Sequence, residues 1–184
     1  MTKIKRDSIN ELKFSKLPSE RLDEALNLIH GVFWEFNAPM HSEEAKQSFT
    51  EVVNYEDYKE RLERKHYEDS EDLFFFCFDH LLPDFDMWIC EDNGEIVGVL
   101  AADSVYIDLL YVDGKYHRRG IAKKLFSMML EHFDSDEVSL ISSPYAVKIY
   151  KKLGFRATGE ELHNGGMSAI PMTYIRSYDV SKAA

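Results

Sequence analysis

The chain has 184 residues, and its 22 Lys and Arg against 33 Asp and Glu give a formal net charge of −11. The length and the 45% hydrophobic content are typical of one folded domain with its own core, and they exclude an intrinsically disordered chain. No apolar run approaches the roughly 20 residues of a membrane helix, the opening segment has no apolar secretory signal, and two cysteines, Cys77 and Cys90, cannot form a disulfide framework, so we expect a cytoplasmic protein with no membrane contact.

The N-terminal part of the chain predicts one strand followed by helices. Residues 11–17 alternate imperfectly between apolar and polar side chains, which indicates a short strand. After Pro18 the apolar residues recur at steps of three and four, which predicts a helix that ends at Ala38-Pro39. Ser42 is expected to cap a second helix, because serine is a favoured N-cap. The apolar stripe of the first helix consists of Leu22, Leu26, Ile29, Phe33 and Phe36.

Residues 55–65 predict a third, highly charged helix, and residues 73–78 form an apolar block that fits either a helix or a strand. We interpret that block as core, with a substrate wall as the alternative. Three consecutive antiparallel strands follow at residues 87–90, 95–102 and 105–112. The first two are joined through Asn93-Gly94, the pair most favoured in tight hairpin turns.

The C-terminal part alternates helices and strands. Helical periodicity begins at Arg119, and a strand is predicted at residues 138–141. Ser143 and Pro144 fit the first positions of a helix that runs to about Lys152, with Gly154 as its C-terminal glycine. Residues 155–160 and 170–177 predict two late strands separated by a glycine loop. The apolar face of the helix after Arg119 consists of Ala122, Leu125, Phe126, Met129 and Phe133.

Together these elements predict one α/β domain over residues 1–184, with a mixed, mostly antiparallel sheet flanked by helices and no repeat or linker. Charge is distributed unevenly along this domain. Residues 41–86 carry fourteen Asp and Glu against five Lys and Arg, whereas residues 115–156 carry nine Lys and Arg against four Asp and Glu. The positive stretch suggests a polyanionic ligand, with a solvated helix face as the alternative.

Several chemistries are excluded by the absence of their motifs. The chain has no phosphate-binding GxxxxGK[ST], no GxGxxG, no GxSxG and no HExxH. Its seven histidines show no metal-ligand spacing, so we expect no metal site. Cys90 lies in a predicted strand and Cys77 in the apolar block, so both are interpreted as inert core residues rather than nucleophiles.

Residues 109–125 are the most informative segment, because a strand there runs into a short basic loop and a helix. The first backbone N–H groups of a helix lack internal partners and carry the positive end of its dipole. Gly120 and the small Ala122 leave room for a phosphate at that end, and Arg118 and Arg119 add charge. A pyrophosphate fits this pattern. The alternative is a surface loop with a basic helix start.

A second segment, residues 142–155, places Ala146, Tyr150 and Leu153 on one helix face. An isolated tyrosine in such a stripe more often faces the core than a substrate. The two segments together resemble the main motifs of the GNAT superfamily of acyl-CoA N-acyltransferases. The first motif falls on His117-Arg118-Arg119-Gly120-Ile121-Ala122, and the second on residues 143–150 followed by Leu153-Gly154-Phe155.

The resemblance covers roughly residues 87–176, is weaker over residues 9–49, and is absent from residues 52–86. It departs from the family pattern at two positions. His117 stands where Gln or Arg is usual, and Ser143 stands where Asn is usual. Residues 1–86 then supply the N-terminal strand and the helices of the acceptor side.

The resemblance implies acetyl transfer from acetyl-CoA, as co-substrate, to a primary amine by direct attack in a ternary complex. Two splayed central strands, ending near residues 112 and 141, would form the acyl-CoA slot. Pyrophosphate would lie on the backbone around Gly120, and pantetheine would pair with the strand ending at Val112. The implied cofactor-binding residues are Leu110, Tyr111, Val112, His117, Arg118, Arg119, Gly120, Ile121, Ala122, Ser143, Ala146 and Tyr150.

Catalysis needs a base for the ammonium, donors for the oxyanion, and an acid for the departing thiolate. Family likeness makes Tyr150 the acid, and backbone N–H groups at Leu110 or Tyr111 would be the oxyanion donors. Strand alternation puts Tyr106, Asp108, Leu110 and Val112 on one face, apart from any bulge, so Asp108 is the candidate base. The alternatives are a solvent-facing Asp108 or a buried carboxylate that only orients water.

Two rival functions remain at this point. One is an acyl-CoA-binding sensor or interaction module of the same fold without catalysis. The other is a nucleic-acid contact by residues 117–124, which the net charge of −11 disfavours. The acidic stretch 41–86 predicts a cationic acceptor, although such surfaces also serve solubility alone. A homodimer is an expectation from the family alone.

Overall fold

The computed structural model describes residues 12–52, 86–164 and 166–176. The predicted helix 55–65 and the apolar block 73–78 lie outside these ranges. The strands are β1 (Lys13–Lys16), β2 (Asp86–Asp92), β3 (Glu95–Ala102), β4 (Ile107–Val112), β5 (Glu137–Ser142), β6 (Arg156–Ala157), β7 (Leu162–Asn164) and β8 (Met167–Ile175). The helices are η2 (Ser19–Arg21), α1 (Leu22–Val32), η3 (Phe33–Asn37), η4 (Ala38–Met40), α2 (Glu43–Val52), η5 (Gly114–Tyr116), α5 (Ile121–Phe133) and α6 (Val147–Leu153).

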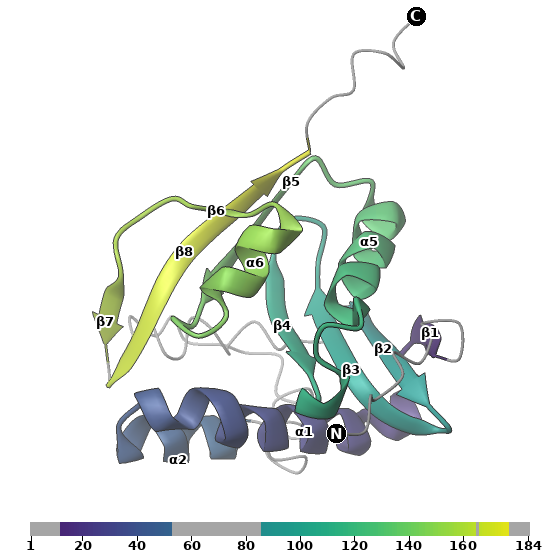
Figure 1. Cartoon of the computed structure of the whole chain (residues 1–184), viewed down its shortest axis with the longest axis horizontal. Helices are drawn as coiled ribbons and strands as arrows, with labels where there is room; N and C mark the ends of the chain where they lie inside the picture. Colours follow the sequence, from purple (N-terminus) through teal and green to yellow (C-terminus); the bar gives the residue numbers. More distant parts are fainter. Residues whose placement is uncertain (1–11, 53–85, 165, 177–184) are drawn as a thin grey trace, which may run out of the picture.

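The strands form two antiparallel sheets that meet at β4 and β5 (Figure 1). The first sheet has the order β1-β2-β3-β4, and the second has the order β5-β8-β6, with β7 paired to β8. Among the described residues, the sheets are bridged only where Tyr106 pairs in parallel with Ser139. At that bridge the Ser139 backbone N–H donates to the Val105 carbonyl at 2.8 Å. This confirms the predicted mixed, mostly antiparallel fold with splayed central strands.

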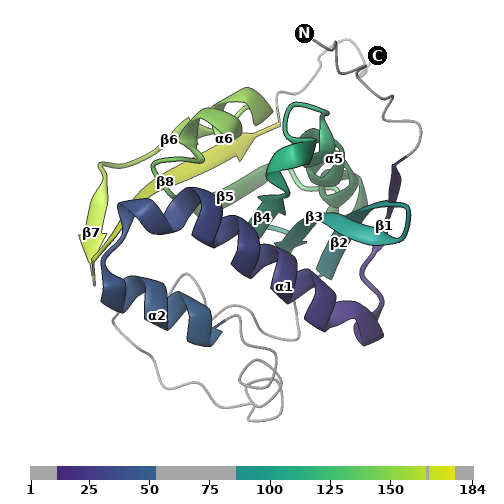
Figure 2. The same ribbon diagram turned by 60° about the horizontal axis from the view of Figure 1, so that its bottom comes forward.

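Helices cover both faces of the strands, and each face has its own core. In Figure 2 α1 crosses in front of the strands, while α5 and α6 lie behind them. On the α1 side the core contains Ala25, Leu26, Ile29 and Phe33 with Ile89, Val99 and Leu109. On the other side it contains Ile121, Leu125, Phe126 and Met129 with Trp88, Cys90 and Leu100. No helix in the described ranges is long and apolar enough to cross a membrane.

A β-bulge interrupts the alternation predicted for β4. Ala101 pairs with Leu109 and Ala102 with Ile107, so Asp108 is the extra residue on β4. Ile107 packs in the same core cluster as Leu110 and Val112, whereas Leu109 packs on the α1 side. The bulge is the exception that the predicted face of Tyr106, Asp108, Leu110 and Val112 allowed for. It shifts the side-chain phase by one residue, so strict alternation does not run through Asp108.

Three local predictions are confirmed. Asn93 and Gly94 have φ angles of 52° and 88°, as a tight hairpin turn requires. Ser42 accepts a hydrogen bond from the Ala45 backbone N–H at 3.2 Å and so caps α2. Gly154 ends α6 in the left-handed conformation, with φ 103°.

Burial raises the pKa of Cys90 to about 12, which keeps this core thiol protonated and unreactive.

Other boundaries differ from prediction. Ser143 and Pro144 lie in a separate turn before α6, in which the Ala146 backbone N–H donates a hydrogen bond to the Ser143 carbonyl at 3.0 Å. The helix itself begins only at Val147. The strand predicted at 155–160 shortens to β6. The next residue, Thr158, still donates to the Pro171 carbonyl at 3.0 Å, but Pro171 has no N–H to donate in return, so the ladder ends there. The last strand begins at Met167 rather than Ile170, because its first residues pair with β7.

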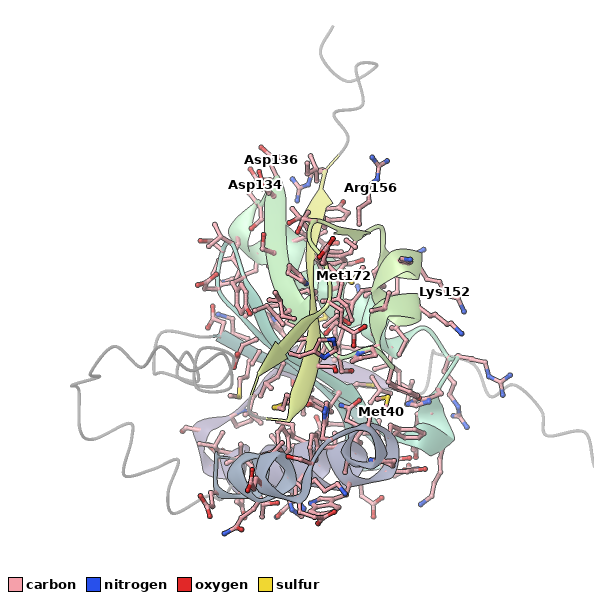
Figure 3. All side chains as sticks on the ribbon, turned by 90° about the vertical axis from the view of Figure 1, so that its left-hand side faces the viewer. Met40, Asp134, Asp136, Lys152, Arg156 and Met172 are labelled. Carbon is pink, nitrogen blue, oxygen red and sulfur yellow. The ribbon has the colours of Figure 1, made fainter. Side chains whose placement is uncertain are left out.

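Helix boundaries also changed. The first helix widens into the π-helical turn η3 at Phe33 and ends in η4, beyond the predicted stop at Ala38-Pro39. The apolar face of α5 was predicted to start at Ala122, but the buried residue at the start of the helix is Ile121. Asp134 and Asp136 lie at one end of the molecule (Figure 3). The Arg176 guanidinium donates to Asp134 at 2.9 Å and lies 3.9 Å from Asp136, so these contacts tie the end of β8 to the segment before β5.

We expect Gly98→Ala to destabilise the protein by about 1–3 kcal/mol, the typical cost of overpacking. A Cβ on Gly98 in β3 would lie 2.8 Å from Cγ2 of Ile121, so α5 would have to move off the sheet. Urea denaturation measures the change. The matched control is Gly31→Ala in α1, where nothing lies within 4 Å. It should stabilise by about 0.5–1 kcal/mol, and equal effects at both sites would contradict the packing argument.

Candidate active site

One cavity of about 420 Å³ lies between η3, β4, the start of α5 and α6. Its lining includes residues 108–112 of β4 and Ile141 of β5, the two strands at which the first and second sheets separate (Figure 1). Nearly all residues predicted for the site line it. They are Asp108, Leu110, Tyr111, Val112, His117, Arg118, Gly120, Ile121, Ala122, Ser143, Ala146 and Tyr150.

Arg119 is the predicted site residue that does not line this cavity. Its guanidinium lies 4.8 Å from the ring centroid of Tyr116, in a cation–π arrangement. The hydroxyl of Tyr116 in turn donates to Asp92 at 2.7 Å. Arg119 therefore packs against the η5 turn rather than facing the cavity.

The loop before α5 has a backbone suited to an anion. Arg118 and Gly120 have positive φ angles of 64° and 87°, and Gly120 directly precedes the first residue of α5. Left-handed residues alternating with ordinary ones turn successive N–H groups toward one point, which forms an anion-binding nest. The free N–H groups of the first helical turn add to it. These N–H groups make this end of the cavity a candidate phosphate cradle.

His117 serves this loop in a way that the sequence did not predict. Its Nε2–H donates to the carbonyl oxygen of Val112 at 2.8 Å, which ties the loop to the end of β4. Its ring also lies 4.9 Å from that of Phe36. Nε2 is therefore occupied, and only Nδ1 remains for a ligand.

Phe36 in η3 contacts both the loop before α5 and the loop before α6. Its place in the apolar stripe of the first helix predicted only a core position. Its ring stacks on Tyr145 at 5.2 Å, and a Cβ on Gly114 would lie 2.8 Å from its Cζ. Asn37, the next residue, accepts a hydrogen bond from the Ser143 hydroxyl at 3.1 Å. The end of the first helix is thus fixed to the loop before α6. Only the apolar stripe signalled Phe36, and nothing in the sequence distinguished it from a core residue.

Asp108 and Tyr150 form the chemically distinctive part of the cavity. Tyr150 is 7% exposed, and burial together with the nearby Asp108 charge raises the pKa of its hydroxyl. Both carboxylate oxygens of Asp108 are buried and have no hydrogen-bond partner among the described residues. Burial and the neighbouring Asp103 raise the pKa of Asp108 well above its ordinary value. A protonated tyrosine can donate a proton, and a carboxylate with a raised pKa, once ionised, binds a proton more tightly than an ordinary carboxylate.

His41 was not predicted for the site, yet it lines the same cavity. It is 7% exposed, and its ring stacks on Phe33 at 5.9 Å. Its place just before the N-cap Ser42 carried no motif that could have indicated a role. In the described ranges, no group of three His, Cys, Asp or Glu side chains is arranged to hold a metal ion.

Comparisons with known proteins give a family model and two curated relatives. The family model of the acetyltransferase (GNAT) domain matches residues 37–176. An uncharacterized N-acetyltransferase, YafP of Escherichia coli, is 28% identical over 75 residues, which are 41% of this chain and 49% of that protein. The spermine/spermidine N(1)-acetyltransferase of Bacillus subtilis is 27% identical over 101 residues, which are 51% of this chain and 59% of that protein. The chain thus spans about half the length of these curated relatives.

Solved structures share the fold. A GCN5-related N-acetyltransferase of Rhodopseudomonas palustris superposes with a TM-score of 0.66 at 16% identity, over 89% of this chain and 94% of that one. The PaiA N-acetyltransferase of Thermoplasma acidophilum, solved in complex with coenzyme A, superposes with a TM-score of 0.63 at 18% identity, over 89% of this chain and 98% of that one.

We expect Asp108→Asn to stabilise the folded protein near neutral pH. The unfolded chain ionises Asp108 near pH ~3.9, whereas the folded protein resists that charge because the carboxylate is buried. The folded state therefore binds more protons, and the free energy of unfolding of the wild type falls relative to the variant as pH rises above ~4. Urea denaturation of both proteins at several pH values measures this. A difference that does not change with pH would contradict the raised pKa.

Proposed function

This chain belongs to the GNAT acetyltransferase family, and we propose that it transfers an acetyl group from acetyl-CoA to a primary amine. The observation that carries the proposal is the meeting of three features in one cavity: the phosphate cradle at Gly120, the diverging edge of β4, and the Asp108–Tyr150 pair. Each provides what one part of the reaction needs.

The cradle and the strand edge would hold the co-substrate. The pyrophosphate of acetyl-CoA fits the N–H groups of Arg118, Gly120 and the first turn of α5. Beyond the Tyr106–Ser139 bridge, β4 has no partner strand on its side toward β5 among the described residues, so its outer edge is open to the pantetheine amides. Backbone N–H groups at Leu110 or Tyr111 would then donate to the thioester oxygen as it becomes an oxyanion.

The catalytic pair would move the protons. In the net reaction, an ammonium and acetyl-CoA give an N-acetyl amide, free coenzyme A and one proton. The amine nitrogen forms the new N–C bond, and the C–S bond breaks. We assign Asp108 as the base that removes the ammonium proton, directly or through water. Tyr150 would give its phenolic proton to the departing sulfur, and its raised pKa suits that role because it keeps the hydroxyl protonated.

The acceptor is proposed to be a cationic amine. In the described part of the acidic stretch, α2 carries Glu43, Glu44 and Glu51. The Bacillus subtilis relative is named for spermine and spermidine, which supports the same class. A screen of amines that follows coenzyme A release tests the function. Release with polyamines that weakens at high salt supports it, whereas no release with any amine would contradict it.

Gly120→Glu should abolish the stabilisation by acetyl-CoA, because it puts a side chain and a negative charge on the phosphate cradle. For the wild type this stabilisation is ~2.7 kcal/mol at a hundred times the dissociation constant. Thermal unfolding with and without acetyl-CoA measures it. The matched control is Gly94→Glu, since Gly94 has nearly the same φ, 88° against 87°, and lies in the β2–β3 turn. Both variants share the cost of a left-handed side chain, so Gly94→Glu should keep the stabilisation by acetyl-CoA. An unchanged stabilisation in Gly120→Glu would place the phosphates elsewhere.

Tyr150→Phe should lower kcat by ~10²–10⁴-fold while changing the acetyl-CoA dissociation constant only a few-fold, because only the phenolic proton is lost. Steady-state kinetics on the best amine of the screen and a binding titration provide the two numbers. Tyr174→Phe is the control, since Tyr174 packs on Phe126 and Phe155 in the core. Full activity of the Tyr150 variant would remove this hydroxyl from the mechanism.

A further inference from the structure

Two side chains of the described residues carry buried polar atoms without a hydrogen-bond partner. They are His41, through Nδ1 and Nε2, and Asp108, through both carboxylate oxygens. Buried polar groups are nearly always hydrogen-bonded, so each exception needs an explanation. Both residues line the same cavity. A ligand that fills the cavity is the partner that satisfies both.

The imidazole of His41 is held in place rather than free to turn to solvent. Its backbone N–H donates to the Ala38 carbonyl at 3.1 Å, and the next residue, Ser42, donates to the Gly166 carbonyl at 3.2 Å. The ring is stacked on Phe33, with an angle of 11° between the planes. Contacts from η4, the turn before β8 and η3 thus fix the ring at the cavity wall.

The imidazole of His41 is neutral near pH 7, so one of its nitrogens can accept a hydrogen bond. Burial lowers its pKa, and the charge of Lys46 lowers it further. Near pH 7 the ring is neutral, so one ring nitrogen has a free lone pair. The neutral imidazole has one N–H donor and one acceptor nitrogen. At the acceptor nitrogen the best partner is an N–H donor, and a charged donor pairs most strongly.

An apolar path of stacked rings connects His41 to the strand that carries Asp108. Phe33, which stacks on His41, also stacks on Phe49 with ring centroids 3.6 Å apart. Phe49 in turn lies 6.4 Å from Tyr111 of β4. All three rings line the cavity. Such a path suits methylene groups, and its flat rings tolerate a cation nearby.

We propose that the acceptor is a diamine, in which an apolar spacer separates the amine that is acetylated from a second amine that donates a hydrogen bond to His41. This inference rests on the proposed function and refines its acceptor class. Asp108 and Tyr150 handle the reacting nitrogen, and His41 binds the distal one. His41 is therefore a specificity-determining residue rather than part of the proton transfers.

The test compares diamines with monoamines of equal chain length in the full-length protein. The probes are 1,4-diaminobutane against butylamine and 1,6-diaminohexane against hexylamine, with coenzyme A release as the readout. In the wild type, kcat/KM should favour the better diamine over its monoamine by about 10- to 100-fold, as expected for one hydrogen bond from a charged group. His41→Phe keeps the stacking but removes both nitrogens, so it should bring this ratio close to one. His41→Gln, which retains an acceptor, should restore part of the ratio.

The matched control is His30→Phe. His30 lies on α1, its Nε2 accepts from Trp34 at 2.9 Å, and it is not among the cavity-lining residues. This variant should keep the wild-type ratio. An acidic surface alone would favour diamines regardless of His41, so an unchanged ratio in His41→Phe overturns the inference. So does an equal loss for diamine and monoamine, which would mark a structural role. If acetyl-CoA binds but no amine releases coenzyme A, the proposed function fails, and the inference fails with it.

Discussion

The separation of β4 from β5 is the constraint on which the rest of the structure depends. Neighbouring strands of a sheet normally satisfy each other's backbone groups along their whole length. In the part of the chain that the structure describes, pairing between the two sheets is limited to the Tyr106–Ser139 bridge. The fold tolerates this because helices on both faces hold the sheets together through two separate cores. The cavity, its open strand edge and the position of α6 all follow from that one interruption.

The bulge at Asp108 follows from the same place in the fold. It lies one residue into β4, just past the bridge, and it puts an extra residue where the strands begin to part. A carboxylate in a regular strand would face either solvent or an apolar core. The bulge instead leaves the Asp108 carboxylate at the cavity, close enough to Tyr150 to raise the pKa of that hydroxyl. Bulges often redirect a side chain next to an active site, and this one joins the two groups on which the proposed chemistry depends.

Local chemistry made much of this predictable from sequence. The turn at Asn93-Gly94, the cap at Ser42 and the glycine at 154 each follow from backbone preferences of single residues. The start of a helix next to Gly120 was predictable because the loop-to-helix motif there is contiguous in sequence. His41 and Phe36 were not, since their roles arise from contacts with residues far along the chain. The bulge was also hidden, because hydrophobic alternation has no means of marking an inserted residue in a strand of six residues.

The π-helical turn η3 has a consequence for how this site can diverge. Within five residues it directs Phe33 toward His41 and Phe49, and Phe36 toward Tyr145 and His117. A wide turn of this kind depends on one insertion in the helical spacing, so a deletion or a shift there moves both rings at once. Under the proposed function, the contacts to the acceptor and those at the phosphate end of the cavity therefore change together. A descendant that accepts a new amine through changes in η3 would then also have to rebuild its contacts with the coenzyme.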